Sequence, residues 1–356
     1  HQAFAAGERR NDISQQMLQK LTREAGQQAG HLHYIRRTNR PDLLVVDRCH
    51  PGQLIPRPQG VGLARKIGAD LALALICSGA VKSPLINSTD ADVILPNNYF
   101  DLPTPKLSTA AILQPFRHYF DAELELASRL YDIAMYYYVR GLRFAGSGYA
   151  FHTIGSTLRI NAKHYAQVRG FPKRNAAEDF YMLNKLAKTG QIENHPGTAI
   201  SIQARLSDRA PFGTGPALRA ISSLATPITE YGFYDPRVFD MLRIFLATAD
   251  QLHNEDPETC FQAVPEILSW LKQSGLYQLL AKQRRSSNLV FQRFLRDWFD
   301  SFQTLKFIHF MRDQYLPSVA IDSICDGMVL PKAHIQNLES VRWLHRVLTE
   351  EPDPDL

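Results

Sequence analysis

Apolar positions in the first half of the chain alternate between strand-like and helix-like patterns. The apolar run 43–46 ends at an aspartate and is followed by Pro and Gly, which is typical of a buried strand. Leucine and isoleucine recur four apart across 60–78, which predicts an amphipathic helix. A second strand is expected at 84–88, a long helix at about 116–140 and another helix from Glu178. This alternation predicts an α/β fold with a largely parallel sheet.

The pattern changes to helical periodicity alone after about residue 216. Helices are predicted at 239–249, 263–280 and 290–312, with Pro and Gly between them. We therefore expect two domains, an α/β domain over residues 1–215 and an all-helical domain over residues 216–356. Acceptor binding and homo-oligomerisation are both open as roles for the helical region.

The charge of the 356 residues is only mildly basic. Lys and Arg number 40 against 35 Asp and Glu, which gives a formal net charge of +5. Basic doublets are scattered and lack the interleaved aromatic residues that stack on bases, so we expect no nucleic-acid partner. The small excess of cations suits an anionic small substrate equally well.

The length of apolar runs and the spacing of cysteines indicate the cellular compartment of the protein. The longest uninterrupted apolar run, 71–77, is far shorter than the ~20 residues of a membrane span, and no secretory signal opens the chain. The four cysteines lie far apart without a C-x-x-C pair, which favours free thiols in a reducing compartment over a zinc site or disulfides. We therefore expect a cytoplasmic protein with no transmembrane segment.

Two aspartates follow the predicted strand 84–88. Side chains alternate along a strand, so Asp90 and Asp92, two positions apart, are expected to point the same way. Together they could hold magnesium or manganese, with diphosphate oxygens completing the coordination. Aspartates are also common in turns for local hydrogen bonding, which is the alternative interpretation.

Glycines and cations begin the predicted helix at 60–78. Gly60 and Gly62 would let the backbone approach a ligand closely, and the free amides of a helix start favour an anion. Arg65 or Lys66 could add a contact to a phosphate. The alternative is a tight turn followed by solvated cations.

A second acidic pair begins the helix predicted from Glu178. The spacing from Asn175 to Glu178 is that of a capping box, in which Glu178 would only satisfy the amides of the first turn. Asp179 would then face a pocket as a general base.

Two further segments have open interpretations. The polar, glycine-rich loop 207–215 could close over a ligand, with Arg209 on a phosphate and Ser207 or Asp208 near a metal, or it could be an interdomain linker. The tyrosines at 136–138 could stack on a sugar, but aromatic residues at helical spacing are more typical of a core.

In this order, the motifs resemble those of family 2 type glycosyltransferases, which use nucleotide sugars and have the GT-A fold. The similar segments are the helix start with Ala64 and Arg65, the Asp90-Ala91-Asp92 motif, the block 155–172 and the Glu178-Asp179 pair. The likeness covers about residues 40–215. It implies a GT-A domain followed by the helical region.

The resemblance assigns residues to a nucleotide-diphosphate sugar donor. Asp47 would hold the base or the ribose, and Arg65 would lie near the phosphates. The local patterns described above add Gly62 and Arg209 as further candidate phosphate contacts. Asp90 and Asp92 would bind the ribose and the magnesium or manganese ion that bridges the diphosphate.

On the acceptor side, the resemblance makes Glu178 and Asp179 the catalytic pair. Asp179 would deprotonate an acceptor hydroxyl, which attacks the anomeric carbon in line and inverts its configuration. A single displacement needs one base opposite the leaving group, unlike the two carboxylates of a retaining glycosidase.

The chain also departs from the family. Residues 1–12 are polar and do not supply the expected first apolar strand, and the Gln-x-x-Arg-Trp sequence of processive members is missing. The latter favours a single transfer over polymerisation. A retaining GT-A transferase acting on a small acid, a sugar nucleotidyltransferase and a non-catalytic binding module on the same scaffold are the alternatives.

Overall fold

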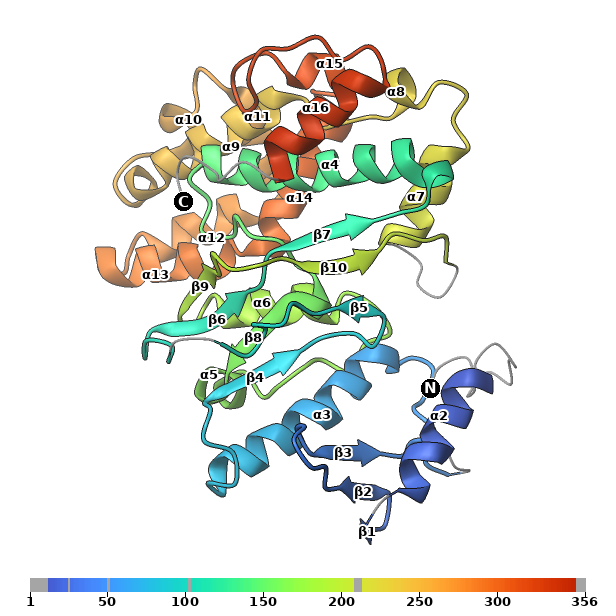
Figure 1. Ribbon diagram of the computed structural model, residues 1–356. Helices are drawn as coiled ribbons and strands as arrows, with labels where there is room; N and C mark the ends of the chain where they lie inside the picture. Colours follow the sequence, from blue (N-terminus) through green and yellow to red (C-terminus); the bar gives the residue numbers. More distant parts are fainter. Residues whose placement is uncertain (1–11, 25, 50–51, 102–103, 208–212, 350–356) are drawn as a thin grey trace.

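The computed structural model describes residues 12–24, 26–49, 52–101, 104–207 and 213–349 (Figure 1). The chain has an α/β fold, in which short strands form three sheets and helices dominate the C-terminal third. The strands are β1 (Gln27–Ala29), β2 (Leu32–Ile35), β3 (Leu43–Val46), β4 (Leu85–Ser88), β5 (Val93–Ile94), β6 (Thr109–Leu113), β7 (Phe116–Tyr119), β8 (Leu158–Asn161), β9 (Gln191–Asn194) and β10 (Ile200–Gln203).

The helices fall into longer elements and single turns. The longer helices are α2 (Asp12–Arg23), α3 (Gly60–Cys77), α4 (Glu125–Phe144), α5 (Ala162–Gln167), α6 (Glu178–Leu186), α7 (Thr214–Ser222), α9 (Pro236–Thr248), α11 (Pro265–Ser274), α12 (Leu276–Gln283), α13 (Asn288–Trp298), α14 (Ser301–Gln314) and α16 (Leu338–Thr349). The short ones are α8 (Pro227–Glu230), α10 (Pro257–Cys260), α15 (Ile321–Ile324) and the 3-10 turns η1 (Ala122–Leu124), η2 (Gly155–Thr157) and η3 (Ala249–His253).

The sheets are mixed, so the prediction of a largely parallel sheet is wrong. In the sheet ordered β4-β8-β6-β9, β8 is antiparallel to both of its neighbours and β9 is parallel to β6. The sheet β5-β10-β7 has one antiparallel and one parallel pair, and β1-β2-β3 is antiparallel throughout. Alternation of strands and helices does not fix strand direction, because a helix can also connect antiparallel strands.

The four-stranded sheet is built around β6, whose five residues are all buried. Two helices, α3 and α6, pack against this sheet together with α5 and contribute Ala69, Met182, Leu183 and Leu186 to its core. Leu158 and Ile160 of β8 point into the same core. Because successive strand residues alternate between faces, Arg159 points to the opposite face.

A long helix, α4, joins the sheets to the helical region. In Figure 1 it lies between β7 and the C-terminal helices, and it packs against α7, α9 and α16. Leu130, Ile133 and Tyr137 of α4 belong to the hydrophobic cluster formed by the helices after residue 213. The core of the helical region therefore includes a helix from the first 215 residues.

Several predicted helices have different bounds. The predicted helix at 116–140 begins instead with β7, and α4 starts at Glu125. The predicted helix 263–280 is divided at Gly275, which has φ of 77° and separates α11 from α12. The predicted helix 290–312 is divided between α13 and α14 at Asp300, whose carboxylate accepts the amides of Phe302 and Gln303.

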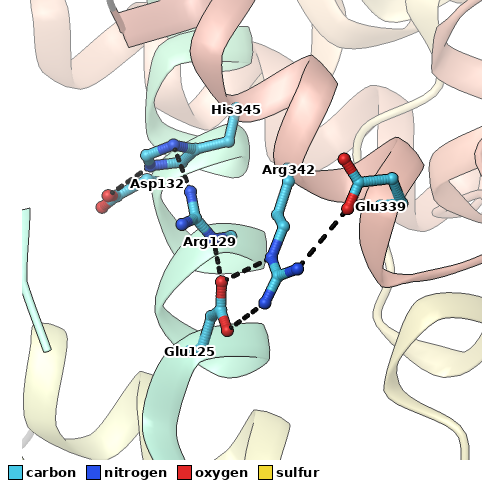
Figure 2. A network of polar contacts seen from close by, with 6 residues as sticks. All are labelled: Glu125, Arg129, Asp132, Glu339, Arg342 and His345. Atoms are coloured by element: carbon cyan, nitrogen blue, oxygen red, sulfur yellow. Dashed lines mark hydrogen bonds and ion pairs between the residues drawn. The ribbon is translucent and has the colours of Figure 1, made fainter. Parts of the chain in front are cut away.

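Buried and half-buried polar residues hold the C-terminal helix α16 on α4 (Figure 2). Glu125 accepts hydrogen bonds from Nε and Nη2 of Arg342, both at 2.8 Å, and from Nε of Arg129 at 2.9 Å. These contacts lower the pKa of Glu125 to about 2, with Arg342 as the largest cause. Glu125 and Arg342 therefore form an ionised pair at neutral pH.

A second part of this network centres on buried Asp132. Nδ1 of His118 donates to Oδ1 of Asp132 at 2.6 Å, and Nε2 of His345 donates to Oδ2 at 3.0 Å. Nη1 of Arg129 donates to Nδ1 of His345 at 3.0 Å, so His345 lies between Arg129 and Asp132. Residues from β7, α4 and α16 are thus joined around one carboxylate.

No helix in the described part of the chain combines the length and the apolar character that crossing a membrane requires.

Candidate functional site

Asp90 and Asp92 lie beyond the end of β4 and each pairs with a different arginine. The strand ends at Ser88, so the alternation expected for these two residues does not extend to them. Oδ1 of Asp90 is 2.7 Å from Nη2 of Arg65, and Asp92 pairs with Arg205, which follows β10. The side chains of Asp90 and Asp92 are 42% and 49% exposed, so each keeps access to solvent.

Arg65 is the centre of the candidate site. Its Nε donates to Oε1 of Glu178 at 2.8 Å, its Nη1 donates to Oγ of Ser88 at 2.9 Å, and its Nη2 donates to Asp90. Burial lowers the pKa of Arg65, but the charges of Asp90 and Glu178 outweigh it and raise the pKa above its ordinary value. The guanidinium therefore joins α3, β4 and α6 as a permanent cation.

Glycines allow this close packing at two points. A Cβ at Gly155 would lie 2.4 Å from Nη2 of Arg65, so only glycine leaves room for the guanidinium. A Cβ at Gly62 would lie 2.3 Å from the carbonyl oxygen of Pro172. The amide of Gly62 donates to the carbonyl of Arg174 at 2.8 Å, so this amide is already used within the chain and does not point to a phosphate.

The acidic pair begins α6 without the predicted capping box. The residue before the helix is Ala177, which has φ of 58°, a left-handed conformation that is strained for alanine. Glu178 is buried and binds Arg65 instead of the first-turn amides. Interpreting Glu178 as a cap is therefore wrong, because its partner lies on α3, 113 positions away.

Asp179 has a raised pKa next to this ion pair. Burial and then the charge of Glu178 raise the pKa of Asp179 to about 6, against smaller opposing effects of the amides of Phe180 and Gly155 and of Arg65. Its Oδ1 accepts the amide of Phe180 at 2.7 Å. A carboxyl group with this pKa can exchange a proton near neutral pH.

An aromatic cavity of about 210 Å³ is lined in part by the residue that follows Asp179. Phe180, the next residue, lines it together with Tyr131, Tyr138 and His152. The charge of Asp179 contributes to the raised pKa of Tyr131, whose hydroxyl contacts Thr214, and burial lowers the pKa of His152 to about 4. The cavity therefore offers aromatic faces and neutral polar groups next to a carboxylate.

The tyrosine run divides between this cavity and the core. Tyr138 lines the cavity. Tyr137 is fully buried, and its hydroxyl donates to the carbonyl of Tyr234 at 2.9 Å. Tyr136 stacks against Phe116 and donates to its carbonyl at 3.1 Å. The core interpretation is thus correct for two of the three tyrosines.

No contact described here places the other residues predicted to bind the nucleotide sugar next to Arg65. Asp47 is buried at the end of β3, in the separate sheet β1-β2-β3, and its Oδ1 accepts the amide of Cys49 at 2.8 Å. Arg209 and Asp208 lie outside the described residues. Their roles stay predictions.

Asp90 and Asp92 have the ligand chemistry that magnesium and manganese prefer. Their carboxylates are hard oxygen donors, and both are partly exposed. Across the described residues, no three His, Cys, Asp or Glu side chains gather closely enough to hold a metal ion. A metal at this place would thus have two protein ligands and would take the others from a bound ligand or water.

Comparisons with protein-family models, with curated proteins and with solved structures find no match for this chain. The function of this chain therefore has to be inferred from the geometry of the site.

Sequence reasoning missed Ser88, Arg205, Tyr131 and the aromatic cavity as parts of the site. Ser88 lies two positions before Asp90, and that nearness was the only available signal for it. Arg205 and Tyr131 come from other segments that only the folded chain brings near Asp92 and Asp179.

Proposed function

We propose that this protein is a metal-dependent glycosyltransferase that moves a sugar from a nucleotide-diphosphate sugar to an acceptor hydroxyl in a single, inverting transfer. One observation carries the proposal: Asp179, with a pKa of about 6, follows Glu178 of the Arg65–Glu178 ion pair and is close enough to Tyr131, in the wall of the aromatic cavity, to raise the pKa of that tyrosine. The order of motifs that resembles family 2 type glycosyltransferases supports it.

Asp179 is the proposed general base. Its pKa of about 6 leaves it ionised at neutral pH and still basic enough to take the proton of a hydroxyl as that hydroxyl attacks. Arg65 fixes the neighbouring Glu178, so the backbone that carries Asp179 is held in place. Glu178 is thus assigned a positioning role.

The cavity is proposed to orient the acceptor. Its aromatic faces suit the apolar face of a ring, and His152, neutral near pH 7, can donate or accept one hydrogen bond. Tyr131 lines the cavity and is close enough to Asp179 for that carboxylate to raise its pKa, so an acceptor bound beside Tyr131 would lie near the proposed base.

The donor diphosphate is assigned to Asp90 and Asp92, which follow β4. Asp90 and Asp92 would hold magnesium or manganese, which when bound neutralises the charge of the leaving diphosphate. Arg65 and Arg205 already neutralise these carboxylates, and they would remain beside the phosphates as fixed cations. Asp47 and Arg209 are further proposed donor contacts.

The first experiment is a thermal-shift panel of nucleoside diphosphates and their sugars, each with and without manganese. A ligand that binds only the folded state raises the melting temperature. We expect a manganese-dependent rise with one nucleotide in the wild type and in the control Asp250→Asn, a change at an exposed aspartate of η3. The same rise is expected to be lost in Asp92→Ala.

The products then separate the proposal from its alternatives. An inverting transferase releases a nucleoside diphosphate and a product of opposite anomeric configuration, whereas a nucleotidyltransferase releases pyrophosphate. Retention of configuration would contradict the role of Asp179. A full panel without any shift would contradict the proposed function as a whole.

A further inference from the structure

A second hollow lies on the other side of α14, away from Asp179. Ser301 and Thr304 of α14 line the cavity beside Asp179, whereas Gln303, Lys306 and Gln314 of the same helix line a groove shared with α11. The groove has a volume of about 420 Å³. The spacing of these residues places the two hollows on different faces of one helix.

Three glutamines give the groove its hydrogen-bonding groups. Gln273 and Gln314 are exposed and Gln303 is half-buried, so their carboxamides are accessible from solvent. Each carboxamide carries two donor hydrogens and an acceptor oxygen. The groove therefore presents donors and acceptors together, the combination that vicinal hydroxyl groups require.

The wall of the groove is aromatic and rigid. Trp270 is 2% exposed and packs edge-on against Phe245 and Phe307 with ring centres 5.5 and 5.0 Å away. Phe310 lines the groove as well. Trp270 therefore supports the groove from the core, and Phe310 supplies the aromatic surface beside the polar groups.

Lys306 makes the groove favour an anion. Burial lowers the pKa of His309, whose Nε2 is 3.0 Å from the hydroxyl of Tyr234, and Asp313 is paired with Arg312 at 2.6 Å. Among the described lining residues, Lys306 is thus the one uncompensated charge, held 4.6 Å from the ring centre of Phe302.

We propose that the groove between α11 and α14 binds an acidic sugar, a hexuronate ring whose hydroxyls meet the glutamine carboxamides and whose carboxylate meets Lys306. This site is separate from the proposed donor and acceptor positions. Its binding requires neither a nucleotide nor a metal, so it can fail or succeed independently of the proposed function.

The test is saturation-transfer NMR on the full chain with methyl glucuronide, with methyl glucoside as the uncharged probe. We expect the wild type to bind the glucuronide more tightly, and Lys306→Met to remove that preference. Gln303→Ala is expected to weaken binding of both sugars at least tenfold. Gln262→Ala and Lys282→Met, changes of the same residue types at exposed positions outside the groove, are the matched controls.

Every outcome of this experiment either supports or overturns binding of the sugar in the groove. Lys306 is exposed, so Lys306→Met will fold, and a circular dichroism spectrum checks Gln303→Ala. Asp179→Asn must leave the glucuronide signal intact, since a signal lost in that variant belongs to the aromatic cavity. The proposal is overturned by a wild type without saturation transfer, or by binding that survives both groove variants.

Discussion

Asp179 combines a raised pKa with a place at the start of a helix. A helix start normally lowers the pKa of an aspartate, because the first-turn amides favour its ionised form. Here burial and the charge of Glu178 outweigh the amides of Phe180 and Gly155. Ionisation of this carboxylate therefore lowers the stability of the folded protein. Such destabilised groups are typical of catalytic residues.

We expect Asp179→Asn to lose transfer and to gain stability. Removing a general base lowers turnover by about 100-fold or more while leaving nucleotide binding unchanged. The folded-state pKa of about 6 lies above the ordinary 3.8, so the stability that this group contributes is complete below pH 3.8 and is lost as pH rises through 6. The variant should thus melt higher than wild type at pH 7.5.

The measurement is turnover and melting temperature at pH 5 to 8, with Asp250→Asn as the control. Wild-type turnover should fall as pH decreases through about 6. Undiminished turnover in Asp179→Asn would remove the base assignment. A variant that is less active and also less stable would point to misfolding.

Ala177 yields a second prediction. Alanine at φ of 58° is strained by roughly 1 kcal/mol, whereas glycine adopts this conformation freely. Ala177→Gly should therefore leave stability unchanged or raise it by up to about 1 kcal/mol, because glycine also loses more chain entropy on folding. Ala187→Gly, at the right-handed end of the same helix, should lose stability. Urea denaturation compares them, and equal losses would contradict the strain.

At this scale the sequence predicted residue types better than partners. It singled out Arg65, Asp90, Glu178 and Asp179, which the fold brings close together, but it assigned Glu178 to a local cap. The actual partner, Arg65, is 113 positions away, and no local pattern encodes a contact of that separation. The sequence therefore suggested a helix cap for Glu178 where the structure has a long-range ion pair with Arg65.

Among the elements, α16 is held to α4 by both apolar and ionic contacts. Val341, Leu344 and Leu348 are buried against the helical core, and Arg342 binds both oxygens of Glu125. Arginine and carboxylate groups joined by two parallel hydrogen bonds form one of the stronger surface pairings. Solvent at this partly exposed pair reduces its contribution.

Arg342→Met should lower the free energy of unfolding at pH 7 modestly, because solvent screens this partly exposed ion pair. Arg346→Met, an exposed arginine on the same helix, is the control and should change little. The folded-state pKa of Glu125, about 2, lies below the ordinary 4.5, so the stabilisation is complete above pH 4.5 and is lost as pH falls toward 2. The difference between variant and wild type, measured by urea unfolding, should therefore shrink at pH 3. A constant difference would contradict the ionic origin.

Elements were predicted well where a pattern was long or sharply bounded. The helix at 60–78 and the strands at 43–46 and 84–88 are confirmed within one residue at each end. The continuous helix expected at 290–312 was wrong, because the apolar spacing of α13 and α14 continues across the break at Asp300. Periodicity thus detects a buried face but not a change in helix direction.

For the whole molecule, the predicted boundary at 215 separates α4 from its packing partners. Leu130, Ile133 and Tyr137 of α4 are fully buried in a cluster shared with helices after residue 213. Burying side chains of this kind contributes roughly 2 kcal/mol each. Sequence pattern located the change from mixed to helical structure, but it does not reveal which earlier helix the later ones cover.

A chain cut to residues 1–215 should therefore fail to unfold cooperatively. We expect it to bind a hydrophobic dye and to show no sharp thermal transition, because the helices that cover α4 in the full chain are removed. Calorimetry of this fragment and of the full chain provides the comparison. A fragment with its own sharp transition would contradict a shared core and support two independent domains.

The pairing of α16 with α4 also has a consequence for synthesis of the chain. The hydrogen bonds between the two helices join residues 207 to 217 positions apart. Asp132 and Glu125 therefore leave the ribosome long before His345 and Arg342 exist, and at 5–20 residues per second this interval lasts roughly 10 to 40 seconds. Throughout it, a buried carboxylate of the finished protein has to remain hydrated. One face of α4 thus stays uncovered until α16 has been synthesised, and this face is where a folding chaperone would bind the nascent chain.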